Sequence, residues 1–223
     1  MNRATAVAID GPSGAGKSTI ARAAAGHLGF VYVDTGAMYR TIGLAAYRAG
    51  VALGDNEAVL PLLDTIEVGL TYQDGEQRVM LNGEDVSGLI RTPEMSKYAS
   101  FVSAIPAVRA FLLETQRDMA KKHSVIMDGR DIGTVVLTDA ELKLFMTASV
   151  ETRAMRRHLE NLERGLESNL EDITREVAER DYQDTHRENS PLKAAEDAII
   201  LDTSDMTIDE VVDYVMKLVE ERI

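Results

Sequence analysis

The chain has no cysteine, so it can form neither disulfide bonds nor thiolate metal sites. A reducing compartment is compatible with that composition. Histidine is also scarce: there are four, and none is paired with another histidine at the spacing of metal ligands. No flanking motif indicates a Ser/His/Asp triad. These absences argue against histidine-based metal centres and triad hydrolases.

Positive charge is in short supply. The chain has 24 Lys and Arg against 37 Asp and Glu, which gives a formal net charge of −13. This balance argues against a nucleic-acid backbone or an anionic membrane as the main partner. Local clusters of arginine are therefore informative about binding sites, because their charge is opposite to the net charge of the chain.

Long hydrophobic runs are missing as well, and none approaches the roughly 18–20 residues of a membrane span. The first apolar strand follows Met1–Thr5 directly, which leaves no room for a signal peptide. We therefore expect a cytoplasmic protein. With 223 residues, 45% hydrophobic and 27% charged, the chain suits one α/β domain with a small insertion.

The most informative stretch is residues 11–18, Gly-Pro-Ser-Gly-Ala-Gly-Lys-Ser, which fits G-x-x-x-x-G-K-[ST]. An apolar strand at 6–9 precedes it and an Ala-rich helix at 20–25 follows it, as a phosphate loop requires. Glycines let successive backbone N–H groups face a polyphosphate. Lys17 adds a charge near its β- and γ-phosphates, and the Ser18 hydroxyl is a ligand for Mg²⁺. The loop indicates a nucleoside triphosphate but leaves the acceptor open.

The predicted nucleotide-binding residues run from the loop into the helix, whose positive end faces the same anion. They are Gly11, Pro12, Ser13, Gly14, Ala15, Gly16, Lys17, Ser18 and Thr19.

A second apolar strand, residues 30–33, ends in Asp-Thr-Gly-Ala-Met-Tyr-Arg at 34–40. Ligands gather at the carboxyl ends of strands in an open α/β sheet, so Arg40 is well placed to hold a second anion. The alternative is a turn with a helix cap, for which Thr35 is a candidate. The residues alone leave both interpretations open.

Residues 41–64 are predicted to be helical, with breaks at Gly50 and Gly54. Apolar and polar residues then alternate from 66 to 73, and turn signals follow at Asp74-Gly75 and Asn82-Gly83. These patterns predict a small antiparallel meander over residues 65–88, inserted into the α/β chain. An insertion without a function is the alternative.

Helices are predicted over 93–121, with Pro106 starting the second. A third buried strand at 125–127 ends in Asp128-Gly-Arg130-Asp131, on the ligand side of the sheet. Asp128 is a candidate to orient Mg²⁺-bound water. Arg130 and Asp131 either serve the site or form only a surface ion pair; their position favours a functional role.

A fourth strand at 142–146 leads into a long helix that carries Arg153, Arg156 and Arg157 on one face. After a break at 165–168, Asn169 is predicted to cap another helix, which carries further arginines. Such a helical hairpin resembles a mobile lid, and a solvated hairpin is the alternative. A fifth strand at 198–201 precedes a structural final helix with a capping box, Thr207 and Glu210.

Phosphoryl transfer needs positioning and cations around the moving group. An ionised phosphate acceptor needs no catalytic base but does need arginines. The chain offers several in suitable places, at positions 40, 130, 153, 157, 180 and 187. A lid that keeps water from the triphosphate fits the same chemistry.

Five stretches together resemble bacterial cytidylate kinases, and the resemblance runs through nearly the whole chain. They are Asp-Gly-Pro-Ser-Gly-Ala-Gly-Lys-Ser at 10–18, Asp-Thr-Gly-Ala-Met-Tyr-Arg at 34–40, Gly-Glu-Asp-Val-Ser at 83–87, Ile-Arg-Thr-Pro-Glu at 90–94 and Asp-Gly-Arg-Asp-Ile-Gly-Thr-Val-Val at 128–136. The resemblance implies a five-stranded parallel sheet with helices on both faces. It also implies transfer of the γ-phosphate of ATP to CMP or dCMP with Mg²⁺, by a monomer.

The resemblance also implies roles for matching residues. The CMP phosphate would be held by Thr35, Arg40 and Arg130; the family often has Ser in place of Thr35, which keeps the hydroxyl. Cytosine would be read by Ser100, Arg109 and Asp131. The sugar and the phosphates would be held by Arg180, Asp184 and Arg187. The cations around the transferred group would be Lys17, Arg130, Arg153, Arg157 and Arg187.

Base recognition by these residues makes chemical sense, because a carboxylate accepts from cytosine N4 and an arginine donates to its acceptors. Uracil reverses the polarity at positions 3 and 4 and would leave buried groups unpaired. The expected division of the chain is a core of 1–64, 122–150 and 188–223, a nucleoside-monophosphate-binding insertion of about 65–121, and a lid of about 151–187.

Three other classes are weighed against this interpretation. A kinase of another small acceptor is the first: an alcohol is disfavoured by the meander and by the excess of arginines, and UMP by the reversed polarity of uracil. A GTPase-like switch would read guanine with Asn-Lys-x-Asp, and no Asn here is followed by Lys. A partner-binding protein that retains a nucleotide loop would not need the acceptor-side residues.

Overall fold

The computed structural model describes residues 4–73 and 76–222, which form two compact units. Unit 1 comprises residues 1–32 and 120–223, and unit 2 comprises residues 33–119. The boundary between them lies inside one strand, β2 (Val31–Asp34). Each unit has its own hydrophobic core.

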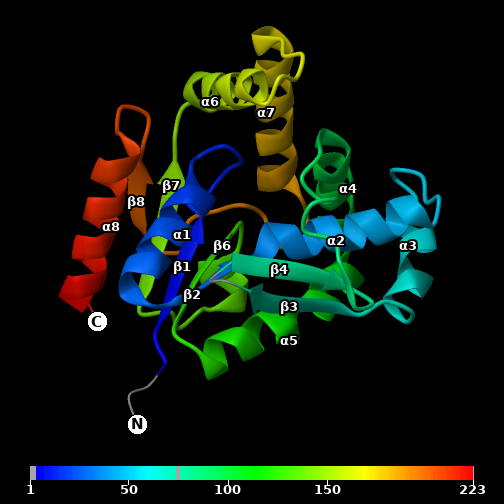
Figure 1. Ribbon diagram of the computed structural model, residues 1–223, viewed down its shortest axis with the longest axis horizontal. Helices are drawn as coiled ribbons and strands as arrows, with labels where there is room; N and C mark the ends of the chain where they lie inside the picture. Colours follow the sequence, from blue (N-terminus) through cyan, green and yellow to red (C-terminus); the bar gives the residue numbers. More distant parts are fainter. Residues whose placement is uncertain (1–3, 74–75, 223) are drawn as a thin grey trace. The chain divides into compact units, whose positions relative to one another are not determined.

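The chain folds around a five-stranded parallel sheet with helices on both faces, as predicted (Figure 1). Its strand order is β2-β6-β1-β7-β8. The other strands of this sheet are β1 (Ala6–Asp10), β6 (Val125–Gly129), β7 (Leu142–Thr147) and β8 (Ile199–Asp202). β1 lies between β6 and β7, with Asp10 in register with Gly129 and Phe145. The carboxyl end of β1 therefore lies beside those of its two neighbours.

The core of unit 1 is built from these strands and two helices that pack on each other, α1 (Lys17–Leu28) and α8 (Ile208–Arg222). β1 and β6 are short and almost fully buried, in keeping with their apolar sequences without alternation, whereas β8 at the edge of the sheet is largely exposed. α8 begins with the predicted capping box: Glu210 accepts from the backbone N–H of Thr207, whose hydroxyl oxygen accepts from the N–H of Glu210. None of the helices within the described ranges is long and apolar enough to cross a bilayer.

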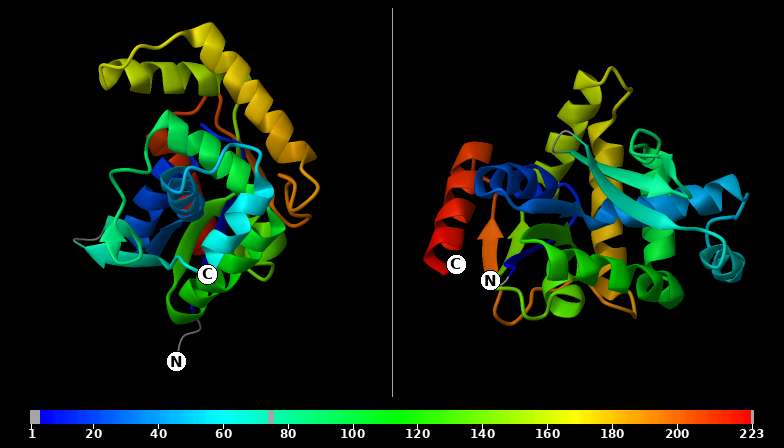
Figure 2. Two further views of the ribbon diagram at one scale, coloured as in Figure 1. Left: turned by 90° about the vertical axis from the view of Figure 1, so that its right-hand side faces the viewer. Right: turned by 60° about the horizontal axis from the view of Figure 1, so that its bottom comes forward.

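Two further helices of unit 1, α6 (Val150–Glu163) and α7 (Leu170–His186), form a helical hairpin (Figure 2). A small apolar cluster of Ala154, Ile173 and Val177 holds them together. Asn169 caps α7 as predicted, because its side-chain oxygen accepts from the N–H groups of Glu171 and Asp172.

Unit 2 packs helices against a three-stranded antiparallel sheet of order β3-β4-β5. Its strands are β3 (Val68–Gln73), β4 (Glu76–Leu81) and β5 (Glu84–Asp85). Its helices are α2 (Thr35–Arg48), α3 (Asn56–Leu63), α4 (Pro93–Ser103) and α5 (Pro106–Lys122), the last of which crosses the unit boundary at residue 120. The meander predicted from the alternating pattern is confirmed. The turn predicted at Asp74-Gly75 lies outside the described residues.

Two local features differ from the sequence-based expectations. Thr35 is not a helix cap: Asp34 caps α2 by accepting from the Ala37 N–H at 2.8 Å, and Thr35 is already the first helical residue. After β6 the chain forms a short π-helix, η1 (Ile132–Val136), that no sequence pattern announced. π-helical turns are rare and occur mostly at functional sites.

Two helices of unit 2, α2 and α4, approach each other closely at Gly43. A Cβ at Gly43 would lie 2.9 Å from the Tyr98 Cβ and 3.1 Å from the Tyr98 carbonyl carbon. The backbone at both atoms is fixed by its helix, so neither has room to withdraw. By contrast, a Cβ at Gly26 in α1 would meet nothing within 4 Å.

We therefore expect Gly43→Ala to lower the free energy of unfolding by about 1–3 kcal/mol through overpacking. The control, Gly26→Ala, should raise it by about 0.5–1 kcal/mol, because alanine restricts the unfolded chain and favours the helix. Urea denaturation of both variants measures the difference. Equal effects at the two sites would contradict the close packing of α2 on α4.

Candidate functional site

The phosphate loop, residues 11–18, joins β1 to α1 as the motif predicts. Gly11 cannot be replaced without moving β7, since a Cβ there would lie 1.9 Å from the Met146 carbonyl oxygen. Gly14 and Gly16 both have positive φ, and Gly16 is the N-cap residue of α1. Gly16 has no side chain to cap the helix, so the first N–H groups of α1 are suited to an anion at the loop. The loop thus has the form of an anion site.

Lys17 is buried within this loop, and its Nζ donates to the Pro12 carbonyl oxygen at 2.7 Å. Burial lowers the pKa of Lys17 to about 7, with the Arg130 guanidinium acting in the same direction and Asp128 and Asp10 acting against it. A buried ammonium beside a guanidinium is unfavourable unless an anion compensates it. The pair is therefore suited to polyphosphate.

Ser18, the predicted Mg²⁺ ligand, donates its hydroxyl to Asp128 Oδ2 at 2.8 Å, and the Tyr32 hydroxyl donates to Oδ1 of the same carboxylate at 3.1 Å. A hydroxyl and a carboxylate are oxygen ligands of the kind that Mg²⁺ takes. No group of three or more His, Cys, Asp or Glu suited to a metal occurs among the described residues. The donor set thus fits an ion that is held by few protein oxygens and completed by phosphates and water.

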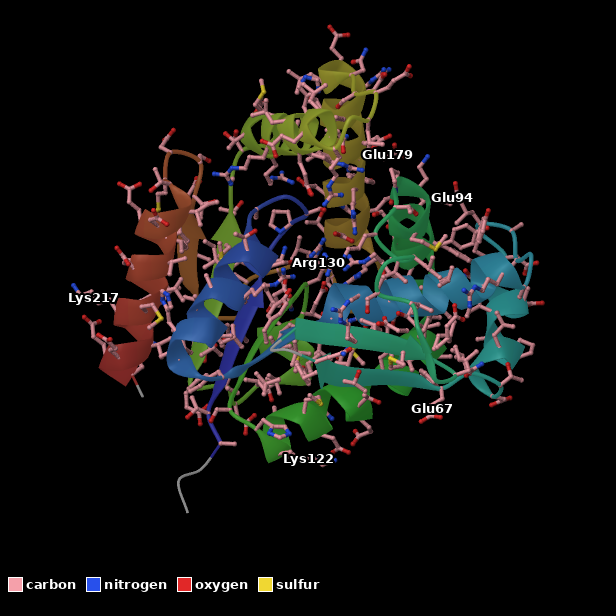
Figure 3. All side chains as sticks on the ribbon, viewed as in Figure 1. Glu67, Glu94, Lys122, Arg130, Glu179 and Lys217 are labelled. Carbon is pink, nitrogen blue, oxygen red and sulfur yellow. The ribbon has the colours of Figure 1, made fainter. Side chains whose placement is uncertain are left out.

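Arg130, labelled in Figure 3, directly follows β6. It is paired with Asp184 of α7, to whose Oδ2 its Nε donates at 2.9 Å. Burial alone would raise the pKa of Asp184, but the Arg130 and Arg180 guanidiniums outweigh it and hold that pKa below its ordinary value. The pair with Asp184 is buried, so Arg130 belongs to a buried cluster of charge in unit 1 rather than to a surface ion pair alone.

Other predicted cations of unit 1 lie in the helical hairpin. Arg153 is almost fully buried; it pairs with Asp181, and it donates to the carbonyl oxygens of Ala148 at 2.8 Å and Ser13 at 3.0 Å. Ser13 is in the phosphate loop, so one arginine links loop and hairpin. Arg157 lies 3.6 Å from Glu176, and Arg187 donates from Nε to the Ser190 carbonyl oxygen at 2.6 Å.

Unit 2 brings together a different subset of the predicted residues. Arg40 NH2 donates to Asp34 Oδ2 at 2.9 Å, while the other oxygen of Asp34 caps α2. Gly36 leaves space for this pair, because a Cβ there would lie 3.2 Å from Asp34 Oδ1 and 3.3 Å from Arg40 NH1. Arg40 Nε is buried and has no hydrogen-bond partner in the part of the chain that the structure describes. Such a donor is suited to an anionic ligand.

The predicted base-reading residues of unit 2 lie at the junction of α4 and α5. Arg109 donates to the Ser103 carbonyl oxygen at 3.1 Å, and its guanidinium lies over the Tyr39 ring at 5.5 Å. The carbonyl of Ser100 accepts from the Ser103 hydroxyl at 2.9 Å. Ser100 and Arg109 are therefore close to one another in the fold, and Tyr39 comes one residue before Arg40.

Sequence reasoning missed three side chains that hold these residues. They are Asp34, which orients Arg40; Asp181, which pairs with Arg153; and Asp10, whose buried carboxylate accepts from the N–H groups of Ile132 at 2.8 Å and Gly133 at 2.7 Å. Asp34 and Asp10 both end a strand of the parallel sheet. Their position at the end of a strand was the sequence signal from which two of these three side chains could have been predicted.

Comparison with known proteins places these features in a family. The model of the family described as "Cytidylate kinase" matches residues 7–221. A cytidylate kinase of Lactobacillus johnsonii is 51% identical over 100% of this chain and 96% of its own length. One from Bacillus cereus is 49% identical over 98% of this chain and 97% of its own. A gluconokinase structure from Sinorhizobium meliloti has a TM-score of 0.51 at 13% identity, over 100% of this chain and 95% of its own, and shows the fold alone.

Asp10 gives a prediction for the pH dependence of stability. Burial raises the pKa of Asp10 from 3.8 to about 6, although the N–H groups of Gly133 and Ile132 lower it in part. The folded chain keeps this proton at pH values where the unfolded chain has lost it. The stabilising contribution is therefore complete below pH 3.8 and is lost as the pH rises through 6.

We expect the difference in unfolding free energy between wild type and Asp10→Asn to shift by about 1 kcal/mol in favour of the variant between about pH 5 and pH 8. Urea denaturation at both pH values measures it. All other titrating groups are the same in both proteins, so their contributions cancel in the difference between the two unfolding free energies. A constant difference across this range would refute the raised pKa.

Proposed function

Because the chain belongs to the cytidylate kinase family, we propose that it transfers the γ-phosphate of ATP to CMP and to dCMP, giving CDP and dCDP. The observation that carries this proposal is the family match over residues 7–221, since a phosphate loop by itself does not identify an acceptor. The chain is a nucleoside monophosphate kinase. We further expect it to act as a monomer in the cytoplasm.

ATP would be bound by residues 11–19, with its phosphates on the backbone N–H groups of the loop and on Lys17. Two observations support this: the positive φ of Gly14 and Gly16, and the uncapped start of α1. Mg²⁺ would be held by the Ser18 hydroxyl, with Asp128 close enough to orient its water. When bound, the ion would neutralise charge on the phosphate oxygens.

CMP would be held through its phosphate by Thr35, Arg40 and Arg130. The buried Arg40 Nε, for which no partner exists among the described residues, supports this role, and Asp34 fixes the plane of the guanidinium. An ionised phosphate is already a nucleophile, so the residues have no proton to remove. Their work is to orient the acceptor oxygen in line with the bond that breaks.

Cytosine would be read by Ser100, Arg109 and Asp131, and the sugar and phosphates by Arg180, Asp184 and Arg187. The arginines at 130, 153, 157 and 187 would surround the transferred group together with Lys17. Arg153 is already paired with Asp181, so its contribution would reach the phosphates through the loop carbonyl that it holds or by exchange of that partner.

The proposal is tested by ADP release with ATP and Mg²⁺, with CMP, dCMP, UMP, AMP and shikimate assayed in parallel. We expect turnover confined mainly to CMP and dCMP. If the protein binds ATP but phosphorylates neither CMP nor dCMP, residues 11–18 would still be interpreted as a phosphate loop. The proposed acceptor site would be refuted.

Two variants separate the acceptor roles. Asp131→Ala should lower the CMP-over-UMP preference by at least about tenfold, because an unpaired buried group no longer rejects uracil. Arg40→Ala should raise KM for CMP by at least about tenfold through loss of a charge-assisted contact. Both should change KM for ATP far less.

Arg48→Ala is the matched control for Arg40→Ala, because Arg48 lies on the same helix and pairs with Glu84 at the surface. It should leave all constants near the wild-type values. An Arg40→Ala enzyme with unaltered CMP kinetics would remove Arg40 from the acceptor site.

A further inference from the structure

We propose that Asp10 is a positioning residue for the acceptor: its carboxylate holds the segment that carries Arg130 and Asp131, so that the phosphate loop and the base-reading segment are anchored to one strand end. Asp10 contacts neither nucleotide in this scheme. The inference rests on the function proposed above and assigns a role to a residue that it left without one.

Asp10 is the last residue of β1, directly before Gly11 of the phosphate loop, and it is in register with Gly129 of β6. Arg130 and Asp131 are the next two residues after Gly129. One strand pair thus delivers the phosphate loop and the base-reading segment side by side within unit 1.

Asp10 also caps η1. The first N–H groups of a helical turn have no partner within it. Asp131 occupies the cap position, yet its side chain makes no cap hydrogen bond. Instead both oxygens of Asp10, 122 and 123 residues away in sequence, accept from the first two N–H groups, those of Ile132 and Gly133. Asp10 therefore takes over the capping role, and the Asp131 carboxylate is not committed to it.

The cost of this arrangement indicates that it serves something other than stability. The Asp10 carboxylate is 4% exposed, and burial together with Asp131 raises its pKa, against the two N–H groups and Lys17. Lys143, whose side chain also approaches Gly133 of η1, is already paired with Asp197 at 2.8 Å. A buried acid is expensive to keep charged. Such groups gather where geometry matters for function.

Gly133 completes the contact from the other side. A Cβ there would lie 3.2 Å from Lys143 Cδ and 3.5 Å from Asp10 Oδ2. Glycine therefore lets η1 approach both the β1 end and β7. Substitution of Gly133 disturbs the same contact without changing the Asp10 side chain.

The test compares Asp10→Asn with a matched control, Glu141→Gln. The Glu141 carboxylate likewise accepts from a backbone N–H, that of Ala6 in β1 at 2.8 Å, but at the opposite end of that strand from Asp10. We expect Asp10→Asn to raise KM for CMP about tenfold and to lower the CMP-over-UMP preference by a similar factor, because a displaced segment misplaces its contacts. KM for ATP should change less than about threefold, and Glu141→Gln should leave all three values unchanged.

Equal effects of Asp10→Asn on ATP and CMP, or no effect on CMP, would overturn the inference, since a cap that only stabilises the fold would not single out the acceptor. If Asp10→Asn does not fold, Gly133→Ala probes the same contact and should show the same asymmetry between CMP and ATP.

Assays of the wild-type enzyme on CMP test the proposed function separately from the role of Asp10. A wild-type enzyme that turns over CMP, combined with a variant of normal selectivity, refutes only the role of Asp10. A wild type inactive on CMP refutes the proposed function and with it the acceptor role. Amide hydrogen exchange at Ile132 and Gly133 then tests the cap alone: exchange faster in Asp10→Asn, and unchanged in Glu141→Gln, supports it, and equal exchange overturns it.

Discussion

The buried ammonium of Lys17 is the constraint on which the rest of unit 1 depends. Burial and the neighbouring Arg130 both lower its pKa, to about 7, while Asp128 and Asp10 oppose them. Two cations inside a protein are unfavourable unless anions compensate them, and Asp128 and Asp10 do so only in part, because the pKa of Lys17 stays lowered. In a chain with a net charge of −13, this buried positive charge is the feature best suited to a polyphosphate. The loop glycines serve it by admitting the backbone close to the same anion.

Much of this architecture could be predicted because the signals are local. The phosphate loop needs a strand before it and a helix after it, and both can be read from adjacent residues. The capping box of Thr207 and Glu210 and the cap at Asn169 depend on residues two or three positions apart. The alternating meander of unit 2 shows the period of a half-buried strand. The family match agrees with the resemblance carried by the motifs.

The contacts that were not predicted are of two kinds. Some join residues far apart in sequence, and others depend on which of two neighbouring residues, with equal propensity for the position, caps a helix. Nothing in the chain around Asp10 indicates that it accepts from residues 132 and 133. The pairing of Arg153 with Asp181 spans 28 residues and depends on how two helices pack. Asp34 and Thr35 are both good caps; the helix simply begins one residue earlier than a Thr35 cap would require. The π-helix after Asp131 is only five residues long, which is too short to show a periodic pattern of apolar residues in the sequence.

The arginines show how an acidic chain can present positive charge that is suited to anions. Arg40, Arg130 and Arg153 each have an aspartate of their own unit as partner: Asp34, Asp184 and Asp181. A carboxylate on one edge of a guanidinium fixes its plane and leaves other donors for a ligand, as Nε of Arg40 illustrates among the described residues. Less side-chain entropy is then lost when a phosphate binds. The acidic residues around these arginines therefore orient the positive charge rather than cancel it, which reconciles the net charge with a phosphate-binding function.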